Sequence, residues 1–190
     1  MCEIRRSGEA IVDRHNGDIF CYKGQTKGQR GVGFIIKKEI IHMVQEIRGI
    51  SERIMVLTLQ TNKRYRTTII QIYAPTENSN DEDIEDFYNE LECTIEKYRS
   101  NRTFIIGDFN SKVGNRRHTH EDPVGPYIYG NRNVRGERLV QFVIEQNMKI
   151  VNTFFRKKLG SKWTWRHPNG TNKNEIDYVL SDSLTGIKNI

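Results

Sequence analysis

The sequence is poor in cysteine and has no long hydrophobic run. Its three cysteines, Cys2, Cys21 and Cys93, are scattered, so they form neither a metal-binding spacing nor a disulfide framework. No apolar stretch approaches the roughly 20 residues that a membrane-spanning helix needs. The first six residues also lack the apolar centre of a secretory signal. These absences predict a protein of a reducing, intracellular compartment.

Length and composition indicate a folded domain. The chain has 190 residues, of which 36% are hydrophobic and 28% charged, values that argue against wholesale disorder. We therefore expect a single domain over residues 1–190, long enough to bury about 70% of the surface that its unfolded chain exposes.

Positive charge is concentrated in one part of the chain. The whole sequence has 30 Lys and Arg against 24 Asp and Glu, a net charge of +6. Residues 111–173 contain 13 Lys and Arg and 4 Asp and Glu, a balance of +9, so the remainder carries −3. A basic segment interleaved with aromatic residues suits a polyanion such as nucleic acid. The alternative is that these cations only solvate loops.

Hydrophobic periodicity predicts a mixed order of strands and helices. Asn80 and three following acidic residues are typical of a helix start, and apolar residues then recur at helical spacing to residue 98. A long polar loop is expected over residues 111–135. Two sheets with helices packed outside them suit this order. Strands are expected at 18–22, 31–37, 53–60, 66–74, 103–107, 149–153, 162–166 and 176–180, and helices at 79–99 and 136–146.

Polar side chains follow or interrupt four of these strands. Tyr73 ends one, Asp108 and Asn110 end another, and Asp177 begins the last. Each has a structural explanation by itself: a core-edge tyrosine, an Asx-turn, or a charge on an edge strand. Thr164 lies between two tryptophans that are equally suited to packing. Their joint occurrence in this order predicts a functional site.

Several motifs, taken in order, resemble one family. They are GVGFII at 31–36, QIYAPT at 71–76, GDFN at 107–110 with VG at 113–114, RGERL at 135–139, NTFF at 152–155, WTW at 163–165 and IDY at 176–178. The chain resembles the endonuclease/exonuclease/phosphatase superfamily. Within it, the motifs are most similar to non-LTR retrotransposon endonuclease domains and craniofacial development protein 2-like proteins. The resemblance covers nearly the whole chain.

The resemblance implies an α/β (α+β) fold, a two-sheet sandwich of the deoxyribonuclease I-like type, and metal-assisted hydrolysis of a phosphodiester. A divalent cation offsets the phosphate charge that repels an anionic nucleophile. The match gives Asp108 the role of orienting or deprotonating water, with a secondary part in metal binding. Asn110 and Tyr73 would contact the phosphate. Asp177 matches the carboxylate that orients a histidine in the family.

The same resemblance implies a cofactor and a partner. The cofactor would be Mg²⁺ or Mn²⁺, and the partner DNA, which would make the protein nuclear. Thr164 would contact a flanking phosphate, with Trp163 or Trp165 at the groove wall. The predicted nucleic-acid-binding residues are Lys112, Arg135, Trp163, Thr164 and Trp165.

Two elements of the family pattern have no match. The catalytic histidine belongs to a Ser-Asp-His element, but only 13 residues follow Asp177, and residues 181–183 read Ser-Asp-Ser. The principal metal ligand is the Glu of a Gln-Glu motif after a buried strand. Glu3 and Glu9 lie too close to the following hairpin for that role. We therefore expect a domain truncated at both ends that lacks terminal strands and the principal metal ligand.

Such a chain should fold weakly, because unpaired central strands expose backbone donors and apolar surface. We expect an endonuclease-like domain of retroelement origin that is inactive or only weakly active. The alternatives are a non-catalytic nucleic-acid-binding remnant and a phosphatase of the same superfamily. Whether the chain is an enzyme is left open by the sequence.

Overall fold

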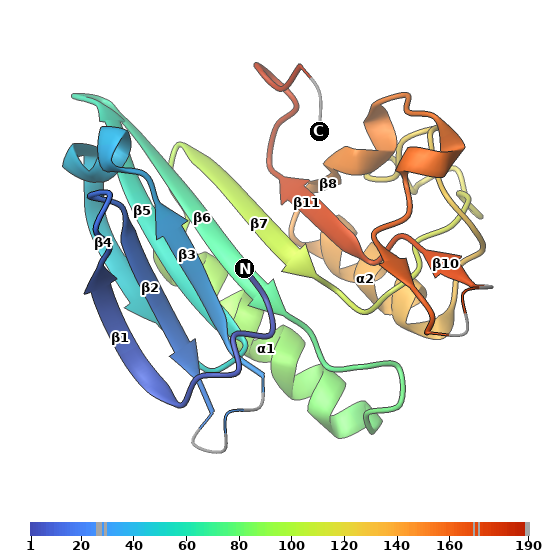
Figure 1. Ribbon diagram of the computed structural model, residues 1–190. Coiled ribbons are helices and arrows are strands. Elements are labelled where there is room, and N and C mark those ends of the chain that lie inside the picture. Colours follow the sequence, from blue (N-terminus) through green and yellow to red (C-terminus); the bar gives the residue numbers. More distant parts are fainter. Residues whose placement is uncertain (26–27, 29, 169, 171, 189–190) are drawn as a thin grey trace.

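A six-stranded sheet forms the centre of the computed structural model, which describes residues 1–25, 28, 30–168, 170 and 172–188 (Figure 1). Its strand order is β4-β5-β6-β7-β11-β8. Only β6 and β7 run parallel, and α1 makes the crossover between them. The strands are β4 (Val44–Gly49), β5 (Ile54–Asn62), β6 (Tyr65–Tyr73), β7 (Arg102–Asp108), β8 (Lys149–Ile150) and β11 (Asp177–Ser181), and α1 is Asp81–Tyr98.

A smaller antiparallel sheet lies over β4–β6 and leaves β7 and β11 uncovered on that side (Figure 1). It consists of β1 (Gly8–Asp13), β2 (Ile19–Gly24) and β3 (Val32–Ile36). The first residues of the chain continue it past β3. Cys2 forms a bridge with Val32, and the N–H of Ile4 donates to the carbonyl of Gly31 at 3.1 Å. The start of the chain is thereby fixed beside the central sheet.

The central sheet separates two hydrophobic cores, because successive side chains of a strand point to opposite faces. On β5, Ile54 and Val56 belong to the core beneath the helices. Met55 and Leu57 belong to the core between the two sheets. All four are buried, so β5 has no solvent-facing side over these residues.

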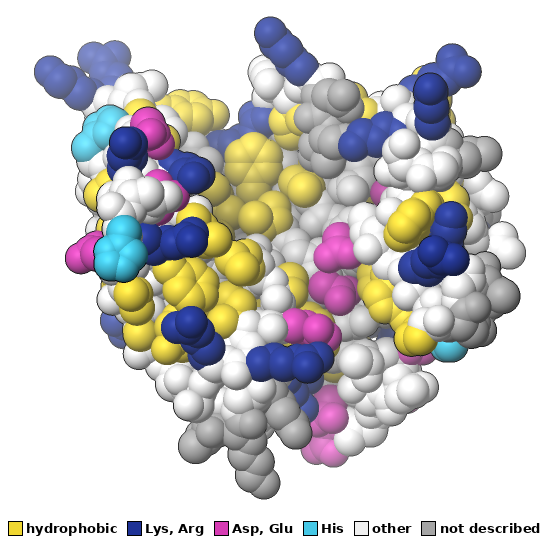
Figure 2. All heavy atoms as spheres, viewed as in Figure 1, with side chains coloured by type: hydrophobic (Ala, Val, Ile, Leu, Met, Phe, Trp, Pro, Cys, Tyr) yellow, Lys and Arg dark blue, Asp and Glu magenta, His cyan; other side chains and the backbone are white. Residues whose placement is uncertain are grey.

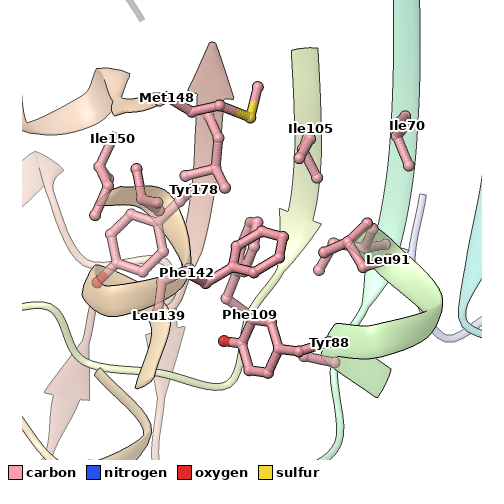
Figure 3. Packing of buried hydrophobic residues seen from close by; sticks show 14 of the residues in the cluster. Ile70, Tyr88, Leu91, Ile105, Phe109, Leu139, Phe142, Met148, Ile150 and Tyr178 are labelled. Carbon is pink, nitrogen blue, oxygen red and sulfur yellow. The ribbon is translucent and has the colours of Figure 1, made fainter. Parts of the chain in front are cut away.

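Helix α1 and helix α2 (Val134–Glu145) cover the face of the central sheet opposite the small sheet. Each begins at an asparagine whose side chain accepts a backbone N–H: Asn80 from Asp83, and Asn133 from Gly136. Figure 3 shows Leu91 and Phe142 pointing toward each other beneath Ile70 and Ile105. The two-sheet α/β architecture predicted from the sequence is confirmed.

Two predicted strands differ from the structure. The strand expected at 149–153 is only β8, and the chain continues as a 3-10 turn, η2 (Val151–Phe154). Here the Asn152 side chain replaces a strand ladder: it donates to the carbonyl of Asp177 and accepts the N–H of Val179. The strand expected at 162–166 is reduced to β9 (Trp165–Arg166), paired with β10 (Lys173–Asn174). The strands β1, β4 and β10 were not predicted from the sequence.

The remaining connections include two further 3-10 turns, η1 (Lys38–Met43) and η3 (Leu159–Ser161). The long loop after β7 is irregular, as expected, and is fixed by a buried arginine. The guanidinium of Arg132 donates to both carboxylate oxygens of Glu121, at 2.9 and 2.7 Å, and to Glu137 at 3.1 Å. Within the described ranges, no helix has the length and apolarity to cross a membrane.

Candidate active site

The polar ends of three central strands meet in one pocket. Sheet register places Asp108 at the end of β7 opposite Tyr73 of β6 and Asp177 of β11. The pocket has a volume of about 570 Å³. Its lining includes the four residues predicted as catalytic, Tyr73, Asp108, Asn110 and Asp177. The lining residues are Cys2, Glu3, Tyr73, Thr76, Glu77, Asn78, Asp108, Asn110, Lys112, Trp165, Asn174, Ile176 and Asp177.

The backbone after β7 is shaped to present Asp108. Gly107 has φ 142°, and a Cβ there would lie 2.0 Å from the carbonyl oxygen of Ile72, so only glycine fits. The Asp108 carboxylate accepts the N–H of Asn110 at 2.8 Å, which is the Asx-turn considered from the sequence. Asn110 has φ 48° and donates its side-chain amide to the carbonyl of Ala74 at 2.9 Å. The turn therefore ends β7 and also places Asp108 and Asn110 in the pocket.

Asp108 holds its proton unusually strongly. Burial raises its pKa to about 7, and the nearby carboxylates of Asp177 and Glu3 act in the same direction, against the N–H of Asn110. Like charges that share a site disfavour ionisation of each. A carboxyl group with a pKa near neutral is suited to exchange a proton with water.

Tyr73 and Glu3 form a second polar pair in the pocket. The Tyr73 hydroxyl donates to Oε1 of Glu3 at 2.9 Å. Burial, followed by this hydrogen bond, raises the pKa of Tyr73 to about 12, so the hydroxyl stays protonated at neutral pH. The guanidinium of Arg53 donates to the backbone carbonyl of Tyr73 at 3.0 Å. The phenol thus remains a hydrogen-bond donor within the pocket.

Thr164 and Asn152 fix the start of β11. The Thr164 hydroxyl accepts the N–H groups of Ile176 and Asp177, at 3.1 and 3.2 Å. Asn152 donates to the carbonyl of Asp177 at 3.3 Å. Thr164 does not line the pocket. In this structure it positions the strand that carries Asp177.

The predicted nucleic-acid-binding residues divide into two groups. Lys112 and Trp165 line the pocket, and Lys112 lies 3.8 Å from Glu77. Trp163 and Arg135 do not. The indole of Trp163 is covered by the ammonium of Lys173, 4.7 Å from the ring centre. The Arg135 guanidinium holds the N-terminus of α1, since it donates to Asp81 and to the carbonyl of Ser79, both at 2.7 Å.

Glu3 is the residue of the site that sequence reasoning excluded. Its nearness to the following hairpin argued against a metal-ligand position. The structure instead carries residues 1–4 along β3, where Cys2 bridges Val32, so the short distance along the chain is no obstacle. The residue before it, Cys2, is partly buried and donates its thiol to the carbonyl of Ile72 at 3.2 Å, a contact that no local sequence pattern signals.

No histidine lines the pocket in the part of the chain that the structure describes. His118 and His120 stack on each other, with ring centres 5.3 Å apart, in the long loop. Among the described residues, no group of three or more His, Cys, Asp or Glu side chains forms a metal cage. Any cation here would therefore take some of its ligands from water or substrate.

Figure 2 shows the surroundings of the pocket. A hollow opens between the small sheet and the C-terminal part of the chain, with hydrophobic side chains at its floor. Acidic side chains gather inside it, and Lys and Arg side chains stand around its rim. A basic rim around an acidic centre is the charge pattern expected for a polyanion held against a cation.

Carboxylates, an amide and a tyrosine at strand ends of a two-sheet α/β fold define the endonuclease/exonuclease/phosphatase superfamily as the class of this protein. The family model described as endonuclease-reverse transcriptase matches residues 67–188, and the chain belongs to that family.

Two curated relatives are called craniofacial development protein 2, from Bos taurus and Tragulus javanicus. Each is 28% identical over 183 residues, or 95% of this chain. The chain spans only 30% and 31% of their length.

Solved structures share the fold at low sequence identity. The endonuclease domain of TRAS1, a telomere-specific non-LTR retrotransposon, is 13% identical with a TM-score of 0.57, covering 92% of this chain and 67% of that one. The 3′ phosphatase NExo from Neisseria, bound to a product DNA hairpin, is 16% identical with a TM-score of 0.58, covering 92% and 66%. The superfamily thus includes both nuclease and phosphatase neighbours.

Proposed function

We propose that this domain hydrolyses phosphodiester bonds of DNA with Mg²⁺ or Mn²⁺, and that its own turnover is slow. The observation that carries the proposal is the convergence of Glu3, Tyr73, Asp108, Asn110 and Asp177 in one pocket. These residues supply carboxylates for a cation and a base, together with hydrogen-bond donors for a phosphate.

The donor set suits a hard divalent cation. Glu3 and Asp108 are close enough that the charge of Glu3 raises the pKa of Asp108. Mg²⁺ is usually held by one or two carboxylates with water and substrate phosphate as its other ligands, so a protein cage of three side chains is not required. Bound there, the ion would neutralise phosphate charge and stabilise the leaving oxygen.

Each side chain has a separate role in the reaction. The Asp108 carboxylate would take the proton of the attacking water. A new bond forms from the water oxygen to phosphorus, the opposite P–O bond breaks, and the leaving oxygen takes a proton from solvent. Tyr73, Asn110 and Lys112 offer donors to the phosphate oxygens. Because no histidine is among the described lining residues, no imidazole is available there to assist Asp108, and we expect slow turnover.

DNA is the favoured substrate for two reasons. The segment between Asp108 and Asp177 carries most of the basic excess. NExo, which shares the fold, was solved with a DNA hairpin, and the other neighbour is the endonuclease domain of a retrotransposon, TRAS1. A retroelement origin of this chain, and action in the nucleus, belong to the same proposal.

Nicking of supercoiled plasmid tests the proposal. We expect slow Mg²⁺-dependent nicking that falls at least about 100-fold in Asp108→Asn, the usual contribution of a positioned base. Asp122→Asn, an exposed aspartate of the long loop, is the matched control and should nick like the unchanged chain.

Three results would contradict the proposal. Equal nicking by Asp108→Asn would remove the site from the reaction. DNA binding without nicking would support a non-catalytic remnant. Release of a terminal phosphate from a linear duplex, without cleavage of the plasmid, would support a phosphatase.

A further inference from the structure

A second pocket, of about 580 Å³, is lined mainly by cations. Two segments form it: residues 126–128 from the long loop, and residues 156–158, which follow η2. Lys162 completes the lining. No role in the proposed reaction uses this pocket.

Among the described residues, the cations at its rim form no ion pair, although the charge of Lys157 is felt by buried Glu175. Arg156, Lys157 and Lys158 are exposed, and none forms an ion pair or side-chain hydrogen bond with the described part of the chain. Elsewhere several arginines form ion pairs, as Arg132 and Arg138 do with glutamates. Three adjacent unpaired cations at one concave surface favour an anionic ligand.

Lys162 gives the pocket a rigid base. It is only 5% exposed, and its ammonium donates to the carbonyl of Tyr127 at 2.6 Å and to that of Asn152 at 3.4 Å. This bonding ties the loop that holds residues 126–128 to the segment that holds residues 156–158. Burial lowers the pKa of Lys162, and the charge of buried Glu175 offsets this only in part. An additional anion would therefore be favourable.

The pocket is near enough to serve the same DNA strand. Lys162 lines it, and Trp165 lines the candidate active site. Residues three positions apart are separated by at most about 11 Å between Cα atoms. Since each strand of B-DNA carries a phosphate per about 3.4 Å of helix axis, the two pockets lie within a few nucleotides of each other.

We propose that this pocket is a second phosphate-binding subsite that grips the DNA backbone a few nucleotides from the bond to be cleaved. The inference rests on the proposed function for its ligand, DNA. Arg156, Lys157 and Lys158 would bind the DNA phosphate. Lys162 would act as a positioning residue, because it ties together the two segments that form the pocket.

The test measures binding without hydrolysis. A fluorescent 20-bp duplex is titrated with the full chain in EDTA between 50 and 200 mM salt. Because each neutralised phosphate contributes about −0.9 to the slope of log K against log salt, we expect the triple variant Arg156→Ala, Lys157→Ala, Lys158→Ala to lower the slope magnitude by about two to three. The same variant should bind at least about tenfold more weakly at 100 mM salt.

The matched control removes equal charge at the opposite end of β6. Lys63, Arg64 and Arg66 are exposed at the β5–β6 turn, and their triple alanine variant should change the slope by less than one. Equal effects of the two triples would mean that only net charge matters, and would overturn the subsite; so would no effect of either. A glutamine triple at 156–158 repeats the measurement if the alanine triple melts at a lower temperature.

Failure here is separable from failure of the proposed function. An unchanged slope in a chain that still nicks in Mg²⁺ would remove only the subsite. If the 156–158 triple variant and the unchanged chain had the same salt slope, an inactive candidate active site could not be the cause, because the binding measurement in EDTA involves no cleavage.

Discussion

At the scale of single residues, the site combines groups that the sequence indicated and one that it concealed. The placement of Tyr73, Asp108, Asn110 and Asp177 in one pocket was predictable, because polar residues at strand ends lie where rigid backbone converges. Glu3 was not, because its place depends on pairing between residues 1–4 and β3, about thirty positions away. Long-range pairing of that kind leaves no periodic pattern in so short a segment.

The role of Glu3 leads to the first prediction. Glu3→Gln should lower nicking and raise the Mg²⁺ concentration for half-maximal activity, because a neutral amide attracts the cation less than a carboxylate does. The loss should reach at least the 10–100-fold typical of residues that only support metal ligands. Glutamine still accepts the Tyr73 hydroxyl, so the fold should be kept. The measurement is a Mg²⁺ titration of plasmid nicking.

Glu9→Gln is the control for that prediction. Glu9 lies on β1, is exposed, and forms an ion pair with Lys23 at 3.4 Å. Its Mg²⁺ dependence should match the unchanged chain. If Glu3→Gln also matched it, Glu3 would have no part in binding the cation.

At the scale of elements, the long loop depends on Arg132. This arginine is almost fully buried with Glu121, and removing one partner of a buried pair typically costs about 3–5 kcal/mol. We expect Arg132→Met to lower the free energy of unfolding by that amount in urea denaturation. Arg30→Met, which breaks the exposed pair with Glu52, should cost about 0–1 kcal/mol.

The same pair sets a pH dependence. Its hydrogen bonds with Arg132 hold the pKa of Glu121 below the usual 4.5. An acid whose pKa is lowered on folding stabilises the protein above its unfolded pKa, and that stability is lost as pH falls through the folded value. The difference between the unchanged chain and Arg132→Met should therefore be full near pH 7 and shrink below about pH 4.5. A difference that grew in acid would contradict this account.

Strand β7 has two unlike faces, which leads to a further prediction. Ile105 is fully buried beneath the helices, whereas Ile106 is only partly buried on the side that the small sheet leaves uncovered. Ile105→Ala should cost about 2–5 kcal/mol, because it leaves a cavity in a packed core. Ile106→Ala, the same change one residue along, should cost about 1 kcal/mol or less. Equal costs in urea denaturation would mean that the uncovered face is packed.

Helices and strands were predictable where the hydrophobic pattern is long. The predictions failed where side chains take the place of the backbone hydrogen bonds between strands. The helix from Asp81 and the strands β3, β5, β6 and β7 were found within a few residues. The strand predictions at 149–153 and 162–166 failed because Asn152 and Lys162 bond to backbone groups of other segments. Such bonds depend on tertiary neighbours that no local pattern encodes.

At the scale of the whole molecule, one sheet joins both cores. Because β5 sends Val56 to one core and Leu57 to the other, neither core can lose its packing without disturbing the strand they share. We therefore expect the chain to unfold in a single cooperative transition. Trp163 and Trp165 lie about 100 residues after β5 in the sequence. Their fluorescence therefore reports unfolding of the C-terminal part of the chain separately from the circular dichroism of the whole chain.

Leu57→Ala tests this cooperativity from the core between the sheets. Leu57 is 3% exposed, so its truncation should cost about 2–5 kcal/mol and lower Tm by several degrees, at roughly 2–4 °C per kcal/mol for a chain of this size. Far-UV circular dichroism and tryptophan fluorescence should give the same transition and the same shift. If fluorescence kept its original midpoint while the dichroism signal moved, the C-terminal part would be folding independently of the small sheet. The hollow between them would then be a boundary between two units, and the pocket that joins Glu3 to Asp177 would form only when both are folded.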